Sequence, residues 1–317
     1  MPAADKNADL ALQLRGGYYF GQLERLIRDL QPLLHLGEPR SVEIDLQKMV
    51  FIGPTGTALL LATANRLGEL GCEVQIAPPS NPLTFRYLMR SDFIRLFTSS
   101  EYPEPFSRKA PKGFRPCAHF TTDQECTQVS RELSDALIER APTDAGARGA
   151  IKTALHELAE NVIFHADTPS GGYAAAAYSR KRHEIEMGIV DLGIGIRASL
   201  SKNPALGIVG DDVSAVEKAM IPTVSSTPER NAGYGLAFTQ LLLLFNGGSL
   251  RIRSGHGAAI MGPGIDYSAR PDHLPGTLVV LRARTDQPLD ASRAWKGLMK
   301  EIERVVANGG SDGSQSR

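Results

Sequence analysis

The sequence has few cysteines and no excess of charge of either sign. Among 317 residues there are three cysteines, Cys72, Cys117 and Cys126, and no two of them form a C-x-x-C pair. This odd, scattered set argues against a disulfide framework, a zinc site or a dithiol redox centre, so we expect free thiols in a reducing compartment. Lys plus Arg equals Asp plus Glu at 35 each, which excludes the basic surface typical of nucleic-acid binding.

A long hydrophobic run is also missing. The most apolar stretch, LAFTQLLLLF at residues 236–245, is shorter than the about 20 residues that a transmembrane helix needs. The N-terminal segment MPAADKNADLALQL has no basic region followed by an apolar one, as a secretory signal has. These absences favour a cytoplasmic protein with no membrane partner.

Length and composition favour two globular domains. Hydrophobic residues make up 42% of the chain and charged residues 22%, which suffices for ordinary buried cores. Residues 101–118 contain four prolines and no periodicity, so we expect a linker there. The expected parts are domains at 10–100 and 119–286, a C-terminal helix at 287–308 and a disordered tail at 309–317.

The two domains differ in their patterns. In the first, SVEIDL and CEVQIAPP are strand-like and flank the helix-like TGTALLLATANRLGELG, which predicts a small α/β domain with a βαβ unit. In the second, two long helical patterns are followed by four strand-like segments. This order predicts an α+β two-layer sandwich with a mixed sheet.

Residues 189–200, IVDLGIGIRASL, fit the G-x-G-x-x-A loop of dinucleotide-binding domains. That fold requires a crossover helix directly after the loop. The next segment, RASLSKNPALG, has Pro204 in its middle and is too short to cross a sheet. The sequence therefore argues against a dinucleotide site of that kind.

The segment HELAEN places Glu157 and Asn161 four residues apart, on one face of a predicted helix. A carboxylate there can orient or deprotonate a nucleophile, and an amide oxygen is a hard ligand that suits Mg²⁺. A solvated pair is the alternative. The zinc motif H-E-x-x-H is excluded, because position 160 is Glu.

A second glycine pair, Gly233 and Gly235, precedes a strongly apolar helix. Glycines let the backbone approach a ligand closely, and the first amides of a helix bind phosphate oxygens. A tight loop before a buried helix is the alternative.

These segments occur in the order E-x-x-x-N, D-x-G-x-G, G-x-G-L and GT, over roughly residues 120–285. The order resembles the nucleotide-binding boxes of the GHKL superfamily, and most closely its anti-sigma-factor serine kinases. The resemblance implies a Bergerat-type sandwich that binds ATP or ADP with Mg²⁺. It implies Glu157 as general base, Asn161 as the Mg²⁺ ligand and Asp191 as the carboxylate that reads the adenine amino group.

The same resemblance implies further nucleotide contacts and a mobile lid over about residues 197–232. The implied contacts are Gly193, Gly195, Gly233, Tyr234, Gly235, Leu236 and Thr277.

Residues 10–98 resemble a STAS domain, the fold of anti-sigma-factor antagonists, through VEIDLQKMVFIGPTGTALLLATANRL. Thr55 matches the phosphorylated Ser of that family, whereas Gly53 and Pro54 replace its usual Asp and Ser. Three interpretations of Thr55 stay open: a phosphoacceptor, a mimic of one, or the N-cap hydroxyl of its helix.

Together the resemblances imply an ATP-binding signalling protein of the partner-switching type, a serine/threonine kinase or ATPase fused to a STAS-like module. Its expected partner is a regulator or a STAS- or sigma-like protein, and a homodimer stays open. The alternative is a nucleotide-gated binding module with little turnover. Glu157 favours catalysis, because a pure sensor does not need that carboxylate.

Overall fold

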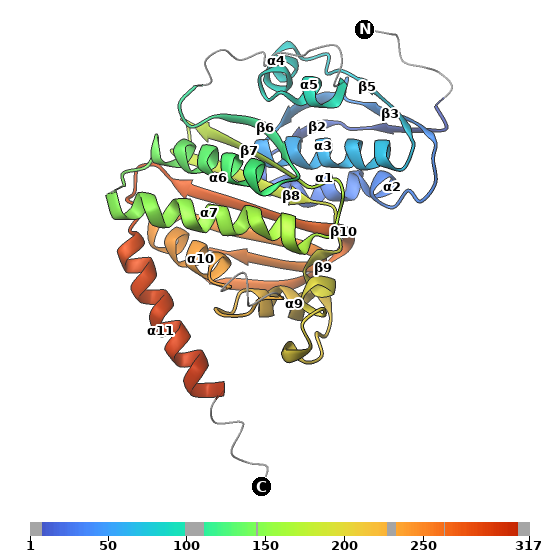
Figure 1. Ribbon diagram of the computed structural model, residues 1–317. Helices are drawn as coiled ribbons and strands as arrows, with labels where there is room; N and C mark the ends of the chain where they lie inside the picture. Colours follow the sequence, from blue (N-terminus) through green and yellow to red (C-terminus); the bar gives the residue numbers. More distant parts are fainter. Residues whose placement is uncertain (1–7, 99–110, 144, 227–232, 263, 310–317) are drawn as a thin grey trace.

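The computed structural model describes residues 8–98, 111–143, 145–226, 233–262 and 264–309 (Figure 1). It is a mixed α/β structure, with parallel sheets in the N-terminal part and a five-stranded antiparallel sheet after them. Parts of the expected linker, lid and tail, at 101–110, 227–232 and 310–317, lie outside the described residues.

Parallel strands build the N-terminal part. They pair in the orders β1-β3-β5 and β2-β4, with bounds β1 (Leu10–Gln13), β2 (Gly16–Tyr18), β3 (Ser41–Asp45), β4 (Met49–Ile52) and β5 (Glu73–Ala77). The helices are η1 (Phe20–Gln22), α1 (Leu23–Asp29), α2 (Gln31–Leu34), α3 (Pro54–Glu69), α4 (Pro82–Arg90) and α5 (Phe93–Thr98). β3, α3 and β5 form where the sequence predicts a βαβ unit.

The second part contains the five-stranded sheet, in the order β6-β7-β8-β10-β9. The strands are β6 (Arg115–Phe120), β7 (Gly172–Ser179), β8 (Glu184–Asp191), β9 (Ser249–Met261) and β10 (Ile265–Arg284). All neighbouring pairs are antiparallel, so the expected mixed sheet is wrong. The reason is connectivity: β9 and β10 form a hairpin, and β10 lies between β8 and β9.

The last residues of the expected linker also differ from the prediction. Residues 115–118 are part of β6, which pairs with β7 at the edge of the sheet. A proline-containing strand is tolerated at an edge, where one side of its backbone needs no partner strand.

The second part has the helices α6 (Asp123–Ile138), α7 (Ala145–His165), α8 (Gly195–Leu200), η2 (Pro204–Leu206), α9 (Asp212–Ala219), α10 (Gly235–Asn246) and α11 (Ala291–Gly309). Helices of this set cover one face of the sheet, whereas α11 packs against α7 and α10 (Figure 1). α10 ends at Gly247, whose φ of 69° provides the left-handed C-cap. In the described part of the chain, no helix combines the length and hydropathy needed to cross a membrane.

Both faces of the five-stranded sheet are buried, each by a different part of the chain. On β8, Ile185, Met187 and Ile189 pack under the helices of the second part. Val190 points the other way and shares a core with residues of α1 to α3. Because side chains alternate along a strand, the N-terminal part and the sheet form one continuous hydrophobic core on that second face.

Polar contacts join the same two parts. Arg253 of β9 is fully buried, and its Nε lies 3.1 Å from Oε2 of Glu24 in α1. The hydroxyl of Thr55 in α3 donates to Oε1 of Glu186 in β8 at 2.8 Å. Beside it, a Cβ at Gly188 would lie 2.6 Å from Thr55 Oγ1 and 2.8 Å from its Cα. Gly188 therefore sets how closely α3 approaches the sheet.

We expect Gly188→Ala to lower the free energy of unfolding by about 1–3 kcal/mol, because α3 must move away from β8. Gly68→Ala is the matched control, since Gly68 lies on the exposed side of α3 with no atom within 4 Å of its added Cβ. It should raise stability by about 0.4–1 kcal/mol. Urea denaturation of both variants measures the difference, and equal effects would contradict the close packing of α3 on β8.

Candidate functional site

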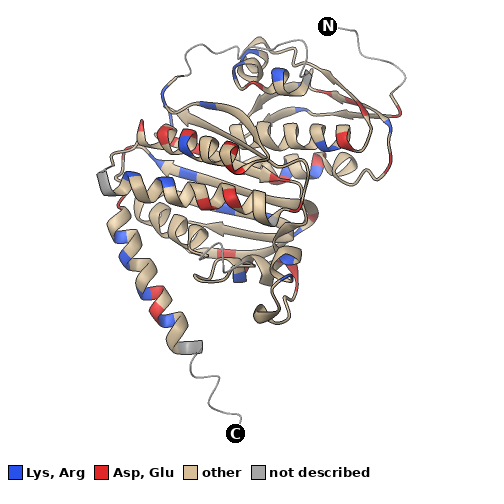
Figure 2. Cartoon of the chain, viewed as in Figure 1, with Lys and Arg blue, Asp and Glu red and all other residues tan. Residues whose placement is uncertain are grey.

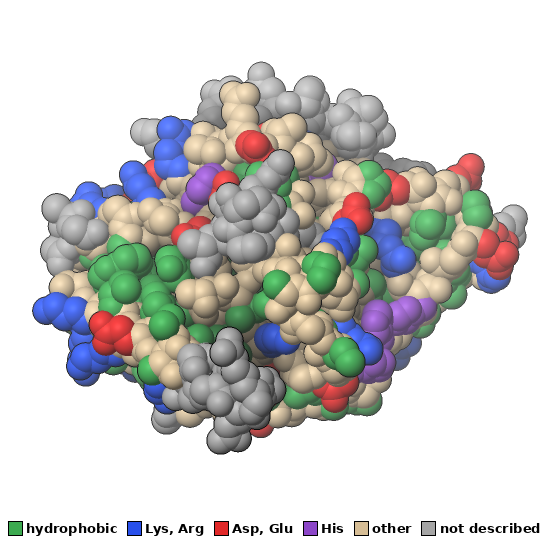
Figure 3. Space-filling model, turned by 60° about the horizontal axis from the view of Figure 1, so that its bottom comes forward, with side chains coloured by type: hydrophobic (Ala, Val, Ile, Leu, Met, Phe, Trp, Pro, Cys, Tyr) green, Lys and Arg blue, Asp and Glu red, His purple; other side chains and the backbone are tan. Residues whose placement is uncertain are grey.

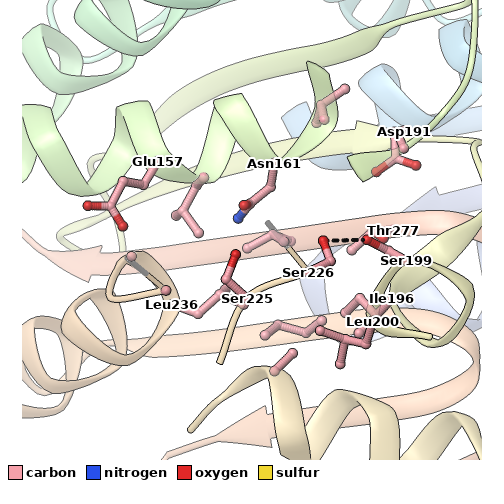
Figure 4. Close-up of a pocket in the computed structure, with 18 of the residues that line it drawn as sticks. Glu157, Asn161, Asp191, Ile196, Ser199, Leu200, Ser225, Ser226, Leu236 and Thr277 are labelled. Atoms are coloured by element: carbon pink, nitrogen blue, oxygen red, sulfur yellow. Dashed lines mark hydrogen bonds between the residues drawn. The ribbon is translucent and has the colours of Figure 1, made fainter. Parts of the chain in front are cut away.

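A pocket lies on the helix-covered face of the five-stranded sheet, between α7, the end of β8, residues 277–279 of β10, residues 195–226 and the start of α10 (Figure 4). Four segments that are distant in the sequence meet there. The predicted site residues that line it are Glu157, Asn161, Asp191, Gly195, Gly233, Gly235, Leu236 and Thr277. The other walls are largely apolar, formed by Leu158, Val162, Ile189, Ile196, Leu200, Val224, Ile252 and Val279.

Two predicted contact residues do not line the pocket. The N–H of Gly193 donates to Oδ1 of Asp191 at 2.9 Å. Tyr234 is the N-cap residue of α10 and packs against the hydrophobic core. Each residue therefore contacts an element that borders the pocket.

Glu157 and Asn161 project from α7 into the pocket (Figure 4). The buried residues Leu155 and Leu158 fix that orientation by holding the neighbouring face of α7 against the core. Oε2 of Glu157 is buried and has no hydrogen-bond partner among the described residues. A buried carboxylate oxygen without a donor is costly, so this atom is available to a ligand or a proton.

The start of α10 lies directly against Glu157. A Cβ at Gly235 would lie 2.8 Å from Cβ and 2.9 Å from Oε2 of Glu157, so only glycine fits without displacement. Burial raises the pKa of Glu157, and the backbone N–H of Gly235 acts in the opposite direction. A carboxylate with a raised pKa is a stronger base than a solvated one.

Asp191 stands at the other end of the pocket, at the last position of β8, and is only 4% exposed. Burial raises the pKa of Asp191 to about 7, although hydrogen bonds from Gly193 and Thr277 act against the rise. Thr277 lies directly opposite Asp191 in the β8-β10 ladder. A carboxylate in such an apolar wall can recognise a ligand that donates a hydrogen bond.

Glycines allow the loops around Asp191 to pack closely. A Cβ at Gly193 would overlap the carbonyl of Ala166 at the end of α7. Gly276 has a φ of +77°, and a Cβ there would overlap the backbone of Asp191 and Leu192. Residues 191–195, the D-x-G-x-G segment, are thus in direct contact with residues 276–277, the GT segment.

Several hydroxyl groups at the pocket were not singled out from the sequence, although Ser199, Ser225 and Ser226 fall within the expected lid. Ser199, Ser225 and Ser226 line the pocket, and the hydroxyls of Ser199 and Ser226 are 3.2 Å apart (Figure 4). The buried Ser254 of β9 accepts from the N–H of Ile196 and donates to the carbonyl of Gly276. Isolated serines in a loop or strand give no pattern, so no sequence signal points to them.

Thr55 is not near the pocket. It is 2% exposed and donates to Glu186, which faces the side of the sheet opposite to Asp191. The apolar helices of the N-terminal part cover the face of the sheet opposite to the pocket. The N-cap interpretation of Thr55 is wrong, since Gly53 is the N-cap residue of α3 and no side chain caps it.

No group of three or more His, Cys, Asp or Glu side chains that could hold a metal ion occurs within the described ranges. Asn161 offers an uncharged amide oxygen as a ligand in the pocket. Such a site suits Mg²⁺ that is bound mainly by phosphates and water, and does not suit zinc.

Comparisons with known proteins add no assignment. No family model matches the chain, and no curated protein matches it significantly.

We expect Asp191→Asn to stabilise the ligand-free protein in a pH-dependent manner. Between pH 3.8 and about 7, folded Asp191 retains a proton that the unfolded chain has lost. The free energy of unfolding of the wild type therefore falls, relative to that of the variant, by about 1.4 kcal/mol per pH unit as the pH rises through this window. Above pH 7 the difference should be constant.

Urea denaturation from pH 4.5 to 8 measures this difference. Asp266→Asn, at an exposed carboxyl, is the control and should show little dependence on pH. A constant difference between Asp191→Asn and wild type over the whole range would contradict a neutral, buried Asp191 below pH 7.

Proposed function

We propose that this protein binds an adenine nucleotide with Mg²⁺ in the pocket and acts as an ATP-dependent signalling kinase or ATPase of GHKL type, with a STAS-like N-terminal part. One observation carries the proposal: Glu157, Asn161 and Asp191 line a single pocket with Gly195, Gly233 and Gly235, although they come from segments far apart in the sequence. A chance set of solvated polar residues would not converge in this way.

The Asp191 end of the pocket suits adenine. The exocyclic amino group of adenine donates hydrogen bonds, and the Asp191 carboxylate accepts them in a site from which water is largely excluded. The flat apolar walls, which include Ile189 and Val279, suit the faces of the ring. Thr277 and Gly193 hold the carboxylate in place.

The Glu157 end suits the phosphates. α10 is 12 residues long, and its first residue, Gly235, borders the pocket. The first amides and the positive end of the helix dipole there attract anions. Because Gly235 has no Cβ, Glu157 lies directly against the start of α10, so the carboxylate and the helix start border the same end of the pocket.

Asn161 lies between the two ends and would hold Mg²⁺ through its amide oxygen (Figure 4). The ion, when bound, neutralises charge that develops on the phosphates. Glu157, with its raised pKa and unpartnered Oε2, would then accept the proton of the attacking hydroxyl. That hydroxyl belongs to water or to a partner protein, because Thr55 faces away from the pocket.

A nucleotide-gated binding module is the second candidate. Ser199, Val224, Ser225 and Ser226 line the pocket, so a bound nucleotide would contact this segment directly. Such contacts favour one position of the segment over others, and can alter a partner surface without turnover. Both candidates use the same nucleotide contacts and differ in the need for Glu157.

We expect Mg-ATP and Mg-ADP to raise the melting temperature of the wild type, and Asp191→Asn to lose this shift. A ligand at about 100 times its Kd stabilises the folded state by about 2.7 kcal/mol. Differential scanning fluorimetry measures the shift, and the variant must melt cooperatively without ligand. A full shift in Asp191→Asn would remove Asp191 from the nucleotide site.

We expect Glu157→Gln to retain the shift but to lose turnover by about 10²- to 10⁴-fold, because the amide keeps the shape and loses the base. ATP labelled at the γ-phosphate distinguishes free phosphate from labelled protein in one assay. Glu160→Gln, on the same helix but paired with His156 outside the pocket, is the control. Unchanged turnover in Glu157→Gln would favour the gated binding module.

A further inference from the structure

The C-terminal helix α11 leaves an apolar surface uncovered. One side of this helix, with Ala294 and Leu298, is buried against the body of the protein. Trp295, Met299 and Val306, by contrast, are 48%, 38% and 67% exposed. In Figure 1 the second half of α11 runs away from the other helices, so nothing in the described chain covers this surface there.

Together with Ile302, which is half-buried against the core, the three exposed residues form a line along the helix. Trp295, Met299, Ile302 and Val306 are spaced by four, three and four residues, which is the alternation of a and d positions in a coiled coil. At 100° per residue they fall within about 60° of arc and extend over about 16 Å of helix. This seam, residues 295, 299, 302 and 306, has the width that fits another helix.

We propose that α11 is a self-association surface, on which the seam of a second copy of this chain packs antiparallel. A two-fold axis between Met299 and Ile302 pairs Trp295 with Val306 of the second copy and Met299 with Ile302 of the second copy. Apolar side chains then meet apolar side chains at all four levels of the seam.

Charge selects the antiparallel direction. Lys296 and Glu303 lie on the solvent-exposed flank of the seam, and both signs of charge occur along α11 (Figure 2). Antiparallel pairing brings like flanks of the two helices together, so Lys296 of each copy lies beside Glu303 of the other. In a parallel pair this flank would meet Leu298 and Val305, which leaves both charges unpaired.

The seam is short, which sets the strength of the dimer. About three turns of helix bury less than the about 800 Å² per partner that stable complexes use. The association is therefore weak and depends on concentration. In the view from below the molecule, hydrophobic side chains are exposed beside charged ones of both signs (Figure 3).

A membrane surface fits this helix less well. Interfacial helices bury a broad apolar face and carry mainly positive charge on the other. Here the rest of the apolar face, at Ala294 and Leu298, is already packed in the protein, and Glu301 and Glu303 interrupt the basic residues of the helix. A narrow seam with acidic residues beside it favours a helix as the partner.

Sedimentation equilibrium of the full chain tests the proposal. We expect the mean mass of the wild type to rise with concentration from 34.2 kDa toward twice that value. Met299→Lys should weaken the dimer by about tenfold or more, because it places a charge in the seam. Arg293→Lys, on the opposite side of the helix, is the control and should dimerise as the wild type does. Cooperative melting of each variant shows that it is folded.

A charge exchange tests the direction. Lys296→Glu and Glu303→Lys should each weaken dimerisation several-fold by placing like charges together, and the double variant should restore it. A wild type that stays monomeric at high micromolar concentration would overturn the proposal. A dimer that Met299→Lys leaves intact would also overturn the proposal, as would a double variant that dimerises no better than the single variants. A wild type that binds anionic phosphatidylserine vesicles and does not dimerise would overturn it too.

Discussion

Strand β8 is covered on both faces, and the two coverings fix the relative positions of the pocket and the N-terminal part. Met187 and Ile189 lie under the helices that form the pocket, while Gly188 and Val190 lie under α3 and its neighbours. A strand alternates its side chains, so a shift of one residue would exchange the two faces. Asp191 then follows at the strand end, on the pocket side.

This shared strand means that the two parts are not independent modules. Removing the N-terminal part would expose Tyr173, Val190 and Val280 on an otherwise buried sheet face. It would also leave the buried guanidinium of Arg253 without Glu24. Both losses act on the strands that carry Asp191 and Thr277, so the stability of the pocket depends on a part of the chain that does not touch it.

Much of the local structure could be predicted from the sequence, because it depends on short-range patterns. The segments around β3, α3 and β5, the helix of Glu157 and Asn161, and the start of α10 at Gly235 were all predictable. The antiparallel order of the sheet and the pairing of β6 with β7 were not, since they depend on contacts between distant segments. The burial of Thr55 was also missed. The only local signal was Gly188, a residue without a side chain inside a strand.

The most direct test of a site that reads adenine through Asp191 is isothermal titration of the ligand-free protein with Mg-ATP and, separately, with Mg-GTP. Guanine carries a carbonyl oxygen where adenine carries its amino group, so it would place an acceptor against the Asp191 carboxylate and leave that carboxylate without a donor. The account predicts saturable binding of Mg-ATP at one site per chain, with Mg-GTP weaker by at least about tenfold. Equal affinity for the two nucleotides, or binding of neither, would contradict it.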